Sequence, residues 1–117
     1  MPVTALIVDD EPDIRELLEI TLGRMNLRTV SAGDLASAKK LLKSEKISLC
    51  LTDMQLPDGN GLTLLEHIQV DYPHIPVAMI TAFGSMDTAI NALKAGAFDF
   101  VSKPINLEQL RGLVETA

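Results

Sequence analysis

Three carboxylates in this chain follow apolar segments that are typical of buried strands. Asp9 and Asp10 come directly after residues 5–8, and Asp53 ends the segment of residues 47–52. Ligands of open α/β sheets bind outside the carboxyl ends of the strands, so two such strands side by side would bring the three carboxylates together. Because like charges repel, a cluster of this kind needs a cation, and Mg²⁺ prefers hard oxygen ligands. The pattern predicts metal-assisted chemistry on an anionic group.

Two further side chains stand at the ends of apolar segments. Thr81 follows residues 75–80, and Lys103 comes shortly after residues 98–101. A lysine and a metal ion on either side of a carboxylate make a pocket for a phosphoryl group, whose transfer depends mainly on positioning and charge stabilisation. A carboxylate in such a pocket can act as a nucleophile and form an aspartyl phosphate.

The elements that must position these residues alternate along the whole chain. Strands are predicted at residues 5–9, 27–31, 47–53, 75–80 and 98–101, and helices have apolar faces over residues 14–25, 35–42, 62–68, 86–94 and 107–114. Five βα units with right-handed crossovers predict an α/β fold, a doubly wound parallel sheet of flavodoxin-like type with helices on both faces. The strand order 2-1-3-4-5 places the first and third strands together at the switch point.

Length and composition narrow the class of protein. The 117 residues predict one domain, residues 1–117, with a net charge of −6 that disfavours direct binding to nucleic acid or to an anionic membrane. The first residues do not resemble a signal peptide, and no apolar stretch is long enough to span a membrane, so we expect a cytoplasmic protein. The last helix runs to Ala117 without a cap, which indicates a domain cut from a longer chain.

The ordered motifs resemble one family, the receiver domains of two-component response regulators. They are VDDE at 8–11, LTDMQLPDGNG at 51–61, ITA at 80–82 and SKP at 102–104. Within that family, TAFGS at 81–85 and KAGAFDF at 94–100 are similar to the nitrogen-regulation (NtrC) class. The resemblance covers essentially the whole chain.

The resemblance implies a phosphoryl acceptor and a metal site. Asp53 would accept a phosphoryl group from a phosphohistidine of a sensor histidine kinase. Asp10, Asp53 and the backbone carbonyl of Gln55 would bind Mg²⁺, or Mn²⁺ in its place, and Asp9 would act through a water molecule. Such a domain catalyses only its own single-turnover phosphorylation and dephosphorylation and is not otherwise an enzyme.

The resemblance also implies a switch. Lys103 would pair with the phosphoryl oxygens, and Thr81 would donate a hydrogen bond to them once the group is present. Phe100 would then turn inward, and the bond between Lys103 and Pro104 would be cis, which the residue types permit. The rearranged surface would be formed by the helix at 86–94, the strand at 98–101 and the helix at 107–114, a possible homodimer interface.

The residues two after the acceptor and two after the threonine, Gln55 and Phe83, would set the phosphoryl lifetime. The class further implies output domains beyond Ala117, an ATPase for σ54-dependent transcription and a helix-turn-helix DNA-binding domain.

Two other functions compete with this interpretation. A phosphatase with an aspartate nucleophile would need a general acid two residues later, where this chain has Gln55. A receiver-like interaction module without phosphorylation usually lacks a key residue, and none is missing here. Taken singly, Asp9, Asp10 and Thr81 could be helix caps, Asp53 a turn residue and Lys103 a solvated side chain; their joint placement at one sheet edge favours a site.

Overall fold

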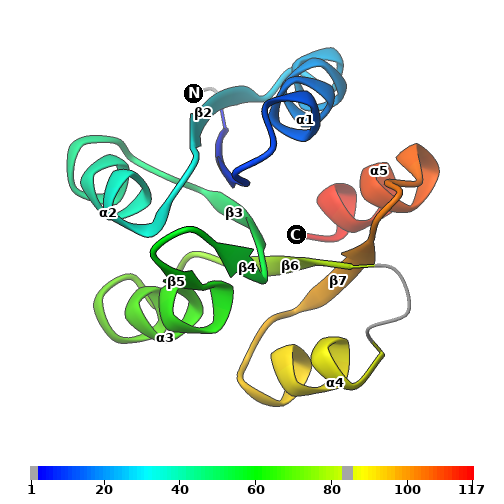
Figure 1. Ribbon diagram of the computed structural model, residues 1–117. Helices are drawn as coiled ribbons and strands as arrows, with labels where there is room; N and C mark the ends of the chain where they lie inside the picture. Colours follow the sequence, from blue (N-terminus) through cyan, green and yellow to red (C-terminus); the bar gives the residue numbers. More distant parts are fainter. Residues whose placement is uncertain (1–2, 83–85) are drawn as a thin grey trace.

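The structure, a computed structural model, describes residues 3–82 and 86–117, and its centre is a parallel sheet (Figure 1). The sheet strands are β1 (Thr4–Val8), β2 (Arg28–Ala32), β3 (Leu49–Asp53), β6 (Val77–Thr81) and β7 (Asp99–Ser102). Their spatial order, β2-β1-β3-β6-β7, confirms the predicted order, with the first and third strands adjacent.

Helices cover both faces of the sheet (Figure 1), and the described residues form five of them. They are α1 (Pro12–Arg24), α2 (Leu35–Ser44), α3 (Gly61–Asp71), α4 (Met86–Lys94) and α5 (Leu107–Thr116). Successive side chains of a strand point to opposite faces, so Ala5 and Ile7 of β1 pack with α1 and α5, whereas Leu6 and Val8 pack in the core under α2 and α3. Among the described residues, no helix has the length and apolar character needed to cross a bilayer.

Side-chain caps explain where several helices begin. Asp34, Asn60 and Asn106 each accept a hydrogen bond from the backbone N–H three residues later, at the start of α2, α3 and α5. Such caps satisfy amides that have no partner within the helix. The strands differ from the predicted ranges by one or two residues: β1 ends at Val8, for example, so Asp9 belongs to the following loop.

A short hairpin between β3 and α3 was not among the predicted strands. Its strands are β4 (Gln55–Leu56) and β5 (Gly59–Asn60). The carboxylate of Asp58, in the hairpin turn, accepts hydrogen bonds from the backbone N–H groups of Leu35 and Ala36, at 2.8 and 3.1 Å. These hydrogen bonds, Leu35 first, hold the pKa of Asp58 below its ordinary value. The hairpin is thereby attached to the first turn of α2.

Candidate functional site

The carboxyl ends of β1 and β3 bring the predicted acids together. The two strands pair in parallel with Val8 opposite Thr52, so the residues that follow, Asp9 and Asp53, lie at one edge. Asp9 is fully buried and Asp53 is 7% exposed, whereas Asp10 is exposed. One carboxylate oxygen from each of Asp9, Asp10, Asp53 and Glu11 lies within 4.8 Å of the others. Glu11 is an addition to the predicted set.

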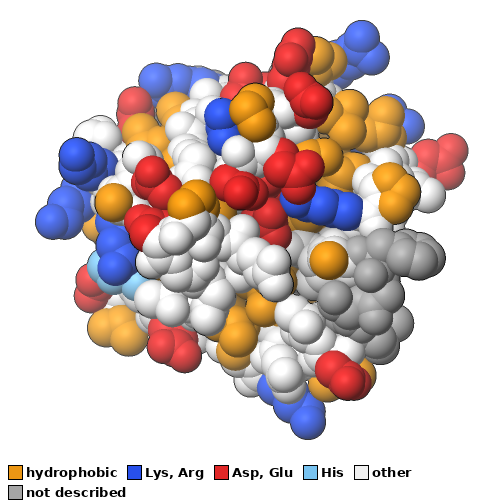
Figure 2. Space-filling view, in the orientation of Figure 1, with side chains coloured by type: hydrophobic (Ala, Val, Ile, Leu, Met, Phe, Trp, Pro, Cys, Tyr) orange, Lys and Arg blue, Asp and Glu red, His pale blue; other side chains and the backbone are white. Residues whose placement is uncertain are grey.

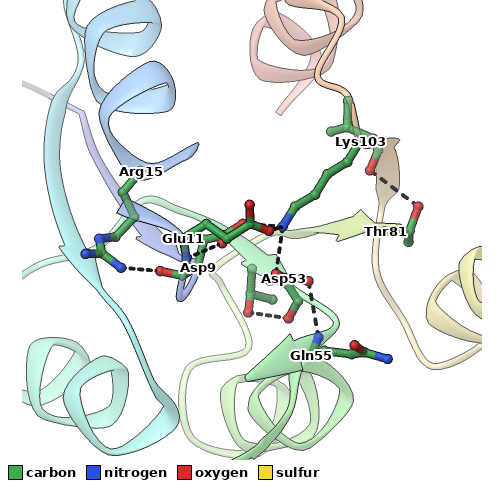
Figure 3. Close-up of polar contacts among 9 residues, drawn as sticks. Asp9, Glu11, Arg15, Asp53, Gln55, Thr81 and Lys103 are labelled. Carbon is green, nitrogen blue, oxygen red and sulfur yellow. Dashed lines mark hydrogen bonds and ion pairs between the residues drawn. The ribbon is translucent and has the colours of Figure 1, made fainter. Parts of the chain in front are cut away.

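Lys103 lies among these carboxylates (Figure 3). Its Nζ is 2.7 Å from Glu11 Oε1, 2.9 Å from Asp53 Oδ2 and 3.1 Å from Asp9 Oδ2. Burial lowers the pKa of Lys103, but the hydrogen bonds to Glu11 and Asp53 and the charge of Asp9 outweigh it, so the net pKa is raised. Lys103 therefore stays cationic and offsets part of the negative charge. Its peptide bond to Pro104 is cis, as the resemblance implied.

Asp9 is held by its backbone and by one of its two carboxylate oxygens. Oδ1 accepts the backbone N–H of Glu11 at 2.9 Å, and the Asp9 carbonyl accepts from Arg15 Nη1 at 2.6 Å (Figure 3). Oδ2 is buried and has no hydrogen-bond partner in the described part of the chain; Lys103 approaches it without hydrogen-bond geometry. Burial raises the pKa of Asp9, and the negative charge of Asp53 raises it further. The hydrogen bond from the Glu11 N–H and the charge of Lys103 lower it, but the net pKa is raised.

Asp53 is oriented from two sides. Its Oδ2 accepts a hydrogen bond from Lys103, and its Oδ1 accepts one from the backbone N–H of Gln55 at 3.2 Å. The backbone beyond it is anchored, because Met54 donates to the carbonyl of Ile80 at 3.0 Å and accepts from Gly61 N–H at 2.8 Å. These contacts hold the side chain of Asp53 at the mouth of the site.

A pocket of about 420 Å³ opens in front of Asp53 and Lys103. Its lining combines the charged cluster with residues of the hairpin, of α3 and α4 and of the segment after β6. The lining residues are Asp10, Glu11, Asp53, Met54, Gln55, Asn60, Leu62, Ala82, Thr88 and Lys103. Acidic side chains gather at the middle of this face, next to a basic one (Figure 2). The donor set fits a hard divalent cation, since it offers several carboxylates and the unpartnered buried Oδ2 of Asp9.

Two predicted residues, Thr81 and Phe100, are not brought into this cluster. The Thr81 hydroxyl faces β7, 3.5 Å from the Val101 carbonyl and 3.4 Å from Ser102 Oγ, and Thr81 is not among the described residues that line the pocket. Phe100 is half-buried and packs against the core beneath α2 and α3. Phe83 lies outside the described residues.

Sequence reasoning gave no role to Glu11, which is the nearest partner of Lys103. A signal was available, because Glu11 directly follows two acids at the predicted site. Asn60 and Thr88 also line the pocket without having been expected there. Their positions follow from the hairpin and from α4, which local patterns do not place.

A doubly wound parallel sheet with an acidic cluster and a lysine at its carboxyl edge defines the class of protein, and comparison with known proteins identifies the family. A family model described as "Response regulator receiver domain" matches residues 5–115, and the chain belongs to that family. It is 67% identical over 113 residues to the response regulator protein PilR of Pseudomonas aeruginosa, covering 97% of this chain and 25% of PilR. The chain thus spans about a quarter of the length of the curated relative it matches.

Solved structures give the same family. NtrX from Brucella abortus in complex with ADP superposes with a TM-score of 0.93 at 35% identity, covering 99% of this chain and 27% of NtrX. The beryllofluoride-activated NtrC4 receiver domain dimer superposes with a TM-score of 0.90 at 32% identity, covering 97% of this chain and 93% of the NtrC4 chain. The chain is a receiver domain of the PilR and NtrC type.

Proposed function

We propose that this receiver accepts a phosphoryl group on Asp53 from a phosphohistidine of a sensor histidine kinase. The observation that carries the proposal is the contact between Lys103 Nζ and Asp53 Oδ2, at 2.9 Å, inside a cluster of acids that opens to a pocket. A carboxylate oxygen of Asp53 attacks phosphorus, an O–P bond forms, and the N–P bond to the kinase imidazole breaks. Lys103 supplies positive charge to the phosphoryl oxygens.

The donor set supports Mg²⁺, or Mn²⁺, as the cofactor. Asp10, Asp53 and the backbone carbonyl of Gln55 would hold the ion, with Asp9 acting through a water molecule. When bound, the ion neutralises charge on the carboxylates and on the transferred group. Gln55, two residues after the acceptor, offers no general acid, so the reaction is single-turnover self-phosphorylation and autodephosphorylation rather than the repeated turnover of a phosphatase.

Phosphorylation changes the conformation of the surface formed by α4, β7 and α5. The phosphoryl group gives Thr81 a new acceptor, which draws its hydroxyl away from β7, and Phe100 turns inward into the space released. A difference in contacts between the two states is what shifts the equilibrium between them. The surface of α4, β7 and α5 exposes Ile90, Leu93 and Leu107, by 43, 41 and 37%. The NtrC4 relative is an activated dimer, and we propose that this chain forms a homodimer through the same surface.

The similarity to PilR extends the proposal to the whole regulator. Residues 1–117 would be the amino-terminal receiver of a cytoplasmic transcription factor whose output domains are an ATPase for σ54-dependent transcription and a helix-turn-helix domain. Type IV pilus genes would be its targets. The receiver itself binds neither nucleic acid nor membrane, in keeping with its net charge of −6.

Intact-mass spectrometry tests the acceptor directly. The parent protein, incubated with Mg²⁺ and acetyl phosphate, should gain one phosphoryl group; Asp53→Asn should gain none, and a chelator should abolish the adduct. If fast sampling finds no adduct, a beryllofluoride titration decides between rapid hydrolysis and a binding module. Failure of the parent to bind beryllofluoride in Mg²⁺ would reject phosphoryl acceptance, and steady turnover of a phosphomonoester would favour the phosphatase.

A further inference from the structure

The ammonium group of Lys103 is surrounded by carboxylates before any phosphoryl group is present. An ammonium offers three protons, and its three nearest acid partners are Glu11 at 2.7 Å, Asp53 at 2.9 Å and Asp9 at 3.1 Å. Two of the protons are donated, to Glu11 and Asp53, and Asp9 lies close without hydrogen-bond geometry. A phosphoryl group that pairs with Lys103 therefore competes with these carboxylates for the ammonium group.

Glu11 is the partner that can leave. The side chains of Asp9 and Asp53 are 0 and 10% exposed, and each is also held by a backbone N–H, whereas the Glu11 side chain is 57% exposed. An exposed carboxylate regains contact with water when it is released, so its ion pair costs the least free energy to break. Glu11 precedes α1 and makes no side-chain cap there, so its release does not disturb the helix start.

We propose that Glu11 is a positioning residue that competes with the phosphoryl group for Lys103. It holds the ammonium over Asp53 in the unphosphorylated domain and is displaced into solvent when the phosphoryl group arrives. The proposal rests on the proposed function, because it concerns how Lys103 becomes available to the phosphoryl group on Asp53. Glu11 opposes phosphorylation, in contrast to Asp10, whose charge is required for the metal.

Removing the competitor should favour the phosphoryl-bound state. Glu11→Gln keeps an oxygen acceptor without charge, and Glu11→Ala removes the contact. At saturating Mg²⁺ we expect beryllofluoride to bind roughly two- to fivefold more tightly to Glu11→Gln and at least as tightly to Glu11→Ala, a range set by the modest strength of exposed ion pairs. In phosphorylation by acetyl phosphate, the half-saturating concentration should fall while the maximal rate stays unchanged.

Asp13 provides the matched control. It is an exposed acid in the first turn of α1, two residues from Glu11, and it has no contact with Lys103 among the described residues. Asp13→Asn removes the same unit of charge. If Asp13→Asn and Glu11→Gln gain affinity for beryllofluoride equally, the cause is a general effect of charge rather than competition for Lys103, and the proposal is overturned. Thermal unfolding of each variant verifies that it is folded.

The remaining outcomes separate the inference from the proposed function. If the parent protein does not bind beryllofluoride in Mg²⁺, the proposed function fails. If the parent binds it and Glu11→Gln binds it equally well, only the competition is rejected. Weaker binding by Glu11→Gln, together with a weaker affinity for Mg²⁺ alone, would instead make Glu11 a member of the metal site and overturn the competition.

Discussion

A Cβ atom at Gly61 would overlap the backbone carbonyl oxygen of Asp53. The first turn of α3 thus lies directly against the strand end that carries the proposed acceptor, and the Gly61 N–H donates to the carbonyl of Met54 at 2.8 Å. The requirement for glycine comes from this close approach. Gly61 thereby belongs to the framework that fixes Asp53.

Gly61→Ala should therefore weaken both the fold and the site. Overpacking a well-packed position costs about 1–3 kcal/mol, and relief of the overlap would displace Asp53. We expect a lower free energy of unfolding in urea and slower phosphorylation by acetyl phosphate. The control is Gly112→Ala in α5, where an added Cβ has nothing within 4 Å and alanine should stabilise the helix by about 0.5–1 kcal/mol. Equal stability of the two variants would contradict the prediction.

Asp9→Asn should stabilise the protein at neutral pH when a chelator removes divalent metal. The pKa of Asp9 is raised by burial and by Asp53. The native state therefore binds the proton of the Asp9 carboxyl group more tightly than the unfolded state does. The stability of the protein falls as the pH rises from the ordinary pKa of 3.8 through the raised pKa of the folded state. The gain in Asp9→Asn should vanish as the pH falls toward 3.8.

Unfolding in urea across a pH series measures this gain. Mg²⁺ should stabilise the parent more than it stabilises Asp9→Asn, since the ion binds the native carboxylates and not the unfolded chain. Asp10→Asn, at an exposed position, should change stability less in chelator. A loss of stability in Asp9→Asn at neutral pH would show that the contact with Lys103 outweighs burial.

Asp58→Asn tests the attachment of the hairpin to α2. Hydrogen bonds from the Leu35 and Ala36 amides lower the pKa of Asp58, so its contribution to stability is present above 3.8 and is lost as the pH falls through the lower folded value. The variant should be less stable than the parent at neutral pH, and the difference should shrink in acid. Glu66→Gln, at an exposed site on α3, is the control. If Glu66→Gln loses as much stability as Asp58→Asn, the hydrogen bonds of Asp58 to α2 contribute nothing specific.

Phe83→Ala should shorten the life of the phosphoryl group. We propose that a bulky apolar side chain two residues after Thr81 keeps water from the acyl phosphate, and a methyl group would not. Decay of the phosphorylated mass after removal of acetyl phosphate measures the half-life. Leu107→Ala, which removes an apolar side chain from α5, should decay like the parent. An unchanged half-life in Phe83→Ala would refute the shielding.

The strands and the acids that follow them were predictable because each depends on a local pattern, and the strand order followed from the general rules for doubly wound sheets. Apolar runs mark buried strands, and parallel strands place the residues after them at one edge, which located Asp9, Asp53 and Lys103. The contact between Glu11 and Lys103 joins residues 92 apart, and that between Asp58 and Leu35 joins residues 23 apart. Such pairs depend on side-chain packing in three dimensions.

Other features escaped sequence reasoning for different physical reasons. Strands of two residues, as in the hairpin of Gln55–Leu56 and Gly59–Asn60, are too short to show alternation. The orientation of Thr81 depends on acceptors that β7 supplies, the Val101 carbonyl and Ser102. The apolar pattern placed Thr81 at the strand end but contained no information about which acceptor its hydroxyl meets.

The pairing of Glu11 with Lys103 has a consequence for how the protein is made. The acids at the beginning of the chain leave the ribosome long before the lysine that neutralises them, and loop closure across so many residues comes late in assembly. A nascent chain that ends before β7 therefore carries Asp53, the proposed acceptor, without its counter-charge. The site is complete only once the last βα unit is present, so under the proposed function a truncated or half-synthesised chain would offer a kinase no complete target.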